Sequence, residues 1–144
     1  MLVPDSDYRE ETIEIYFIAS EPEAMSAVIA VYSLAQNQAL SATEVSEMST
    51  SVSELAMNIV KYAQQGVITV SHIEDLTNSR QGIKVVAKDN GPGIENIAHA
   101  LEEHYSTGSS LGLGLPGVRR MVDEFYIESQ LGSGTRVTVI KWKS

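Results

Sequence analysis

The sequence contains no cysteine, which excludes disulfide bonds and thiolate metal sites. A chain without cysteine suits the reducing cytoplasm, where we expect this protein to reside. Its three histidines, His72, His99 and His104, lack the spacing of a zinc site. No apolar run approaches the roughly 20 residues of a membrane span. The N-terminal residues are acidic and polar, so they do not resemble a signal peptide.

Basic residues are few: ten Lys and Arg stand against nineteen Asp and Glu, for a net charge of −9. Nucleic acids and anionic membranes are therefore poor partners. No Lys or Arg lies between Asp89 and Val118. Any phosphate bound by that segment would have to be met by Mg²⁺, backbone N–H groups and hydroxyls. The length of 144 residues predicts a single domain, 1–144.

The hydrophobic pattern predicts five strands, at residues 12–19, 66–74, 82–88, 125–131 and 135–142. It predicts three main helices, at 24–40, 41–63 and 115–124, and a weaker one at 94–103. Ser41 and Glu44 have the spacing of a capping box at the start of the second helix, and Gly66 follows its end. Because helices and strands alternate unevenly, we expect a two-layer α/β (α+β) sandwich: a mixed sheet with helices on one face.

The second helix carries the first candidate motif. Its apolar stripe, which we expect to face the sheet, comprises Val45, Met48, Val52, Leu55 and Ile59, with Tyr62 as a candidate for its last position. Glu54 and Asn58 share a face about 100° away from this stripe. The amide oxygen of Asn58 suits Mg²⁺, and the Glu54 carboxylate could accept a proton from an attacking hydroxyl. The pair could equally be a solvated surface pair, and we interpret the nearby Lys61 as a solvated lysine.

The second motif follows the predicted strand 82–88. Asp89 ends that strand, where its carboxylate could accept a hydrogen bond from the amino group of adenine but not from guanine, which has a carbonyl there. Gly91 and Gly93 allow positive φ and let the main chain approach a base. An ordinary turn is the alternative interpretation.

The third motif, Gly112, Gly114 and Gly117, matches the G-x-G-x-x-G pattern at the start of a helix. A dinucleotide fold would place a strand directly before it and an acidic residue about 20 positions after it. Here a polar loop precedes the glycines, and Asp123 and Glu124 come too early. The pattern instead favours a loop and helix N-terminus that approach a triphosphate. We expect residues 104–111 to form a mobile lid.

In this order, the motifs resemble those of the GHKL ATPases: Glu54 to Asn58 their N-box, Asp89 to Gly93 their G1 box and Gly112 to Gly117 their G2 box. Gly132 to Thr135 resembles their closing motif. The resemblance implies the Bergerat α/β sandwich, with ATP and Mg²⁺ as cofactors. It implies Glu54 as the catalytic residue and Asn58 as the metal ligand. The nucleotide-binding residues that it implies are Asn58, Asp89, Gly91, Gly93, Ile94, Thr107, Gly108, Gly112, Leu113, Gly114, Leu115 and Thr135.

Small size and a short lid make the chain similar to the anti-sigma-factor-type serine/threonine kinases, in particular to the stressosome switch kinases of bacteria. That similarity implies phosphorylation of STAS-domain proteins and, after release, activation of a PP2C-type phosphatase. Two alternatives remain at this stage. One is an anti-sigma factor that sequesters a sigma subunit. The other is a histidine kinase catalytic domain, against which no helix with a phospho-acceptor histidine precedes the motifs.

Overall fold

The structure is a computed structural model that describes residues 7–102 and 114–144. Five strands form one sheet in the order β1-β2-β3-β5-β4. The strands are β1 (Tyr8–Ile18), β2 (Gly66–Asp75), β3 (Arg80–Asp89), β4 (Glu124–Gln130) and β5 (Gly134–Trp142). The helices are α1 (Glu21–Asn37), α2 (Ala42–Asn58), which continues into a π-helical turn (Ile59–Ala63), α3 (Ile97–Ala100) and α4 (Gly114–Met121).

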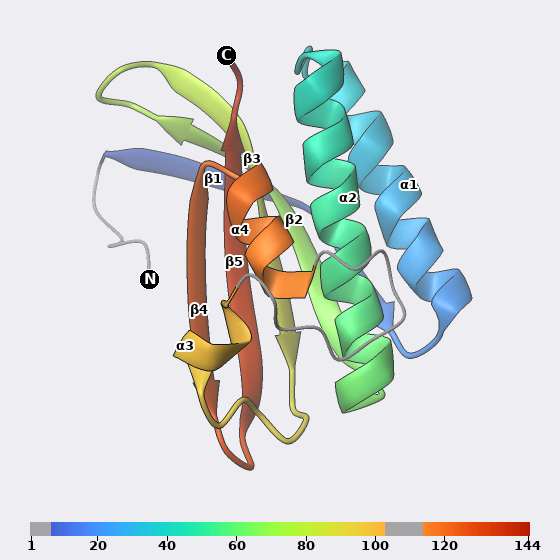
Figure 1. Ribbon diagram of the computed structural model, residues 1–144. Helices are drawn as coiled ribbons and strands as arrows, with labels where there is room; N and C mark the ends of the chain where they lie inside the picture. The colour runs from blue at the N-terminus through green and yellow to red at the C-terminus, as the bar shows by residue number, and fades with distance from the viewer. Residues whose placement is uncertain (1–6, 103–113) are drawn as a thin grey trace.

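Helices α1, α2 and α4 lie on one face of the sheet, which confirms the predicted two-layer sandwich (Figure 1). The expectation of a mixed sheet is wrong, because all four strand pairings are antiparallel. The chain leaves β1, runs through the helix pair α1 and α2, and returns as β2. The chain reverses its direction three times on this path, from β1 to α1, from α1 to α2 and from α2 to β2, so β2 runs antiparallel to β1.

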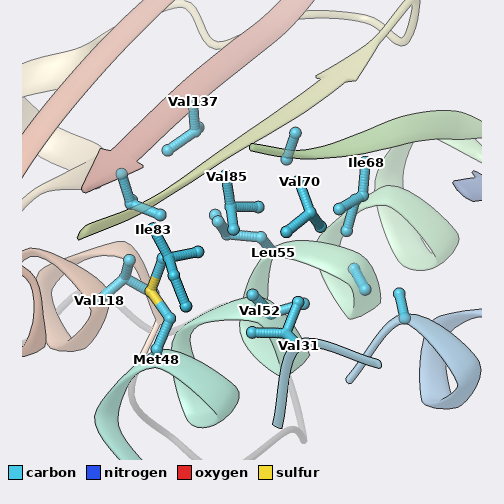
Figure 2. Close-up of a cluster of buried hydrophobic side chains, with 14 of the residues drawn as sticks. Val31, Met48, Val52, Leu55, Ile68, Val70, Ile83, Val85, Val118 and Val137 are labelled. Carbon is cyan, nitrogen blue, oxygen red and sulfur yellow. The ribbon is translucent and has the colours of Figure 1, made fainter. Parts of the chain in front are cut away.

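The core confirms the stripe predicted on α2 except at its last candidate, Tyr62, which is 45% exposed. Val45, Met48, Val52, Leu55 and Ile59 are all buried. Figure 2 shows the cluster between the layers, where helix residues such as Val52 meet strand residues such as Val85. Burial of this kind contributes about 1.5–3 kcal/mol for each large aliphatic side chain. The core therefore holds α2 firmly against the sheet, and with it any functional side chain on the same helix.

Hydrogen bonds decide where α2 begins. The Ser41 hydroxyl accepts from the Glu44 N–H at 3.1 Å, and the Glu44 carboxylate accepts from the Ser41 N–H at 2.8 Å, as the capping-box spacing predicted. The other oxygen of Glu44 accepts from the Ser144 N–H at 3.0 Å. Burial would raise the pKa of Glu44, but these hydrogen bonds to the charged form outweigh it and lower the pKa.

Several boundaries differ from the prediction: β1 begins at Tyr8 instead of residue 12, α1 ends at Asn37 instead of residue 40, and three further differences follow. Helix α3 covers Ile97–Ala100 instead of 94–103, because Ser129 binds the Ile94 N–H in an extended loop and Asn96 caps the helix. Helix α4 ends at Met121, three residues before the predicted end. The end of α2 is not a glycine cap: Gln64 takes the left-handed conformation, with φ 71°, and Gly66 already belongs to β2. Among the described residues, no helix is long and apolar enough to cross a bilayer.

Candidate functional site

Two residues of the first motif sit one turn apart at the end of α2, where the helix widens into the π-turn. Glu54 is only 1% exposed and Asn58 is half-buried. The sequence predicted that they share a face, and their separation of four residues within α2 places them so. Glu54 lies deeper than the expected edge position. A π-turn inside a helix is rare and is frequent at functional sites, and this one begins directly after Asn58.

Lys61 lies within that π-turn, and the structure corrects its interpretation as a solvated lysine. Its Nζ is buried and has no hydrogen-bond partner in the described part of the chain. A buried ammonium without a partner costs several kcal/mol, because desolvation is not offset by a hydrogen bond or a counter-charge. Such a group in a native structure calls for a physical explanation, and a negatively charged ligand is one that would match its charge. The sequence offered one signal for this role: Lys61 follows Asn58 by three residues, on the same side of the helix.

Asp89 ends β3, as predicted, and its side chain is half-buried. Its Oδ1 accepts a hydrogen bond from the Gly91 N–H at 2.8 Å. This bond fixes the carboxylate in an Asx turn and leaves Oδ2 as the acceptor for a ligand. Thr135 is the direct cross-strand partner of Asp89 on β5. The structure therefore brings together two residues that the motifs placed 46 positions apart.

The glycines after Asp89 are required by close packing. A Cβ on Gly91 would lie 2.7 Å from the Cβ of Ala63, in the π-turn that carries Lys61. Gly93 has φ +80°, and its Cβ would lie 2.3 Å from the Gln130 carbonyl. Both glycines allow positive φ, and of the two only Gly93 adopts it. The contact of Gly91 with Ala63 joins the Asp89 loop to the end of α2, so the first two motifs border one region.

Ser129, which none of the sequence motifs contains, connects this loop to the β4–β5 turn. Its Oγ accepts from the Ile94 N–H at 2.7 Å and donates to the Gly134 carbonyl at 3.0 Å. A hydroxyl has one proton, so the 2.8 Å contact with the Thr135 hydroxyl must be a bond that Thr135 donates. The Thr135 oxygen is then left as an acceptor beside Asp89. Nothing in the motif pattern singles out this serine, because its partners come from two other segments, the loop at Ile94 and the start of β5.

Helix α4 begins at Gly114, which has φ +57°, as predicted for a glycine-rich turn into a helix. Leu115 packs against the main core and α4 packs against α2. The other candidates of the third motif, Thr107, Gly108, Gly112 and Leu113, lie outside the described residues, as does the predicted lid at 104–111. The first-turn N–H groups of α4 are the part of the predicted phosphate site that the structure describes.

The chemistry of the site restricts the cation that it could hold. The described part of the chain has no group of three or more His, Asp or Glu side chains arranged around a metal position. Zn²⁺ and Ca²⁺ usually take several such ligands from the protein. Mg²⁺ instead keeps waters and phosphate oxygens and takes one or two protein ligands. An amide such as that of Asn58 therefore fits Mg²⁺ brought in with a polyphosphate.

Comparisons with known proteins agree with this geometry. The family model described as "Histidine kinase-like ATPase domain" matches residues 18–141. The serine/threonine-protein kinase RsbT of Bacillus subtilis (strain 168) is 44% identical over 95 residues, which are 66% of this chain and 70% of that protein. Anti-sigma F factors of Clostridium acetobutylicum and Clostridium kluyveri are 28% and 27% identical, and each alignment covers 92% of this chain and 94% of the relative.

The matched range begins at the end of β1 and includes every motif residue from Glu54 to Thr135. The resemblance to the GHKL ATPases is thereby confirmed, including the similarity to RsbT. The chain belongs to the family of histidine kinase-like ATPase domains.

Proposed function

We propose that this chain is an ATP-dependent protein-serine/threonine kinase. The observation that carries the proposal is the buried Nζ of Lys61, which has no hydrogen-bond partner among the described residues and belongs to the π-turn whose Ala63 packs against Gly91. It supplies the positive charge that the segment between Asp89 and Val118 lacks. The 44% identity to a serine/threonine-protein kinase supports the same assignment.

Each residue then has a chemical task. Asp89 would accept a hydrogen bond from the adenine amino group through Oδ2, and Thr135 would accept a hydrogen bond at the same edge of the base. Asn58 would hold Mg²⁺, whose chemistry is to neutralise phosphate oxygens during transfer. Lys61 would bind the terminal phosphate and orient it for in-line attack. Glu54, buried one turn before Asn58, would accept the proton of the attacking hydroxyl.

Lys61→Met is expected to weaken ATP binding about 10- to 150-fold, since a hydrogen bond to a charged group contributes about 1.5–3 kcal/mol. The preference for ATP over ADP should also fall, because the lost contact is to the terminal phosphate. Without nucleotide, the variant should melt no lower than the unaltered protein, since it removes a buried unpaired charge. Calorimetry and thermal melting measure both effects.

The matched control is Lys84→Met, which removes a lysine that pairs with Glu10 at 2.8 Å on the sheet. This variant should bind ATP normally. Equal ATP affinity in Lys61→Met and the unaltered chain would exclude Lys61 from the phosphate site.

We further propose that the protein substrates are STAS-domain scaffold proteins and that the released kinase binds and activates a PP2C-type phosphatase. The similarity to RsbT supports this partner class. The net charge of −9 on this chain would repel the phosphate group on a newly phosphorylated scaffold and weaken the complex, so phosphorylation would release the kinase. Activation of the phosphatase would need only binding of the released kinase, and no phosphoryl transfer.

Incubation with labelled ATP, Mg²⁺ and a purified STAS-domain protein tests the proposal. We expect acid-stable phosphoserine or phosphothreonine on the substrate, identified by mass spectrometry, and none after chelation of Mg²⁺. Acid-labile phosphate would instead indicate a histidine kinase activity. Absence of any transfer, with ATP bound, would contradict the kinase assignment.

An anti-sigma factor is the second candidate, favoured by relatives of that name that align over 92% of the chain. The kinase and the anti-sigma factor would retain different proteins when the chain is immobilised and incubated with candidate partners. A sigma subunit retained on the immobilised chain, with no STAS-domain protein or phosphatase retained, would favour the second candidate.

A further inference from the structure

Three polar side chains stand in one row across the sheet, one on each of three neighbouring strands. Ser129 of β4 is the direct cross-strand partner of Thr135 of β5, and Thr135 is the partner of Asp89 of β3. Residues directly opposite each other on paired strands point to the same side of a sheet, so the three share one face. Ile127, two residues before Ser129 on β4, packs against the core under the helices. The row therefore lies on the helix-covered face, at the proposed adenine site.

The hydroxyl of Ser129 has its full set of hydrogen bonds inside the protein. It donates its proton to the Gly134 carbonyl at 3.0 Å and accepts from the Ile94 N–H at 2.7 Å. Its second lone pair accepts the proton of the Thr135 hydroxyl, with 2.8 Å between the two oxygens. Ser129 therefore has no hydrogen-bonding capacity left for a ligand, and any effect that it has on a bound base passes through Thr135.

The bond to Ser129 holds the Thr135 hydroxyl in one of its two hydrogen-bonding roles. A free threonine hydroxyl rotates and can either donate or accept. With its proton directed at Ser129, Thr135 offers only lone pairs beside Asp89, whose carboxylate also only accepts. The edge of a base that faces this row must therefore donate. The amino group of adenine does so, and the carbonyl of guanine or hypoxanthine does not.

We propose that Ser129 is a positioning residue that sets base selectivity. It keeps the proton of Thr135 away from the nucleotide, and so disfavours purines that carry a carbonyl at that edge. This inference rests on the proposed function, because it requires ATP at this site.

Backbone contacts fix the surroundings of Ser129 independently of its side chain. Strand β4 pairs with β5 along its whole length. The Gly132 N–H donates to the Pro92 carbonyl at 2.9 Å, which ties the β4–β5 turn to the Asp89 loop. A Cβ on Gly93 would lie 2.3 Å from the Gln130 carbonyl, so the two segments are also in close contact there. Removal of the Ser129 hydroxyl should therefore leave the loop in place.

Calorimetry of ATP and inosine triphosphate (ITP) binding tests the proposal. In Ser129→Ala, the ratio of ATP affinity to ITP affinity should fall at least about fivefold, mainly because Thr135 can then donate to the carbonyl of ITP. Ser129→Cys should lower the ratio in the same direction, since a thiol is a weak acceptor. Ser129→Thr keeps a hydroxyl and suits a strand, so it should retain the ratio of the unaltered chain.

Thr135→Val separates this role from a purely structural one. In that background there is no hydroxyl proton to release, so adding Ser129→Ala should leave the ratio of ATP to ITP affinity unchanged within about twofold. If Ser129 only anchored the loop through Ile94, its substitution would have the same effect in both backgrounds. That result would overturn the proposal.

The matched control is Ser71→Ala, which removes a buried strand serine whose hydroxyl also bonds to a threonine, Thr12, at 3.5 Å. This variant should leave the ratio unchanged. An unchanged ratio in Ser129→Ala, with ATP still bound, would overturn the inference and leave the proposed function standing. Failure of the unaltered chain to bind ATP would overturn both.

Discussion

Glu54→Gln is expected to lower phosphoryl transfer at least about a hundredfold while ATP affinity stays within about twofold, if Glu54 is the general base. Glu54 is 1% exposed beside the motif residue Asn58. Glutamine has the same shape but is a much weaker base, so the substitution removes proton acceptance and leaves the packing of α2 in place. Single-turnover kinetics and calorimetry measure the two quantities separately.

A matched control exists on the same helix. Glu47 pairs with Lys141 at 2.8 Å and takes no part in the site. Glu47→Gln should leave transfer unchanged, although it removes one carboxylate from α2. Unchanged transfer in Glu54→Gln would show that Glu54 is not the general base.

The same variant probes the proposed switch. If phosphorylation releases the kinase from its scaffold, Glu54→Gln should remain on the scaffold after ATP is added, whereas the unaltered kinase leaves. Because activation of the phosphatase needs binding alone, the free variant should still activate it. Capture of scaffold and phosphatase together on one kinase molecule would contradict a shared binding surface.

Asp89→Asn is expected to weaken ATP binding about 10- to 150-fold, which corresponds to the loss of a hydrogen bond to a charged acceptor, about 1.5–3 kcal/mol. The hydrogen-bond geometry at Asp89 explains why the substitution should weaken the binding of adenine in particular. The Gly91 N–H holds Oδ1, so an asparagine that keeps this 2.8 Å bond must turn its NH₂ group toward the base. That donor would face the amino group of adenine, which is also a donor.

A purine with a carbonyl in place of the amino group supplies the control. Inosine triphosphate should bind the unaltered protein poorly and the Asp89→Asn variant relatively better, because the new NH₂ can donate to the carbonyl. Calorimetry with both nucleotides measures this exchange of preference. Equal ATP affinity in the two proteins would remove Asp89 from the adenine site.

Local patterns in the sequence were sufficient to predict much of the fold and to select part of the candidate site. The spacing of Ser41 and Glu44 predicted the start of α2, because a capping box is a contact between residues three positions apart. The 3.6-residue period predicted which face of α2 is buried, from Val45 to Ile59. Glu54 and Asn58, and Asp89 with its glycines, were identified for the same reason: each motif is a short segment.

The tertiary structure decided what depends on distant segments. Burial of the Lys61 Nζ results from packing around the π-turn, and a helical pattern alone assigned this lysine to solvent. Ser129 acquired its role because β4, β5 and the Asp89 loop meet there. The antiparallel sheet and the exposed Phe17 follow from strand order, which places β1 at an edge with helices on one side only. The periodicity of a sequence predicts that a helix or strand has an apolar face. Which other elements pack against that face, and so whether it is buried, depends on the tertiary structure.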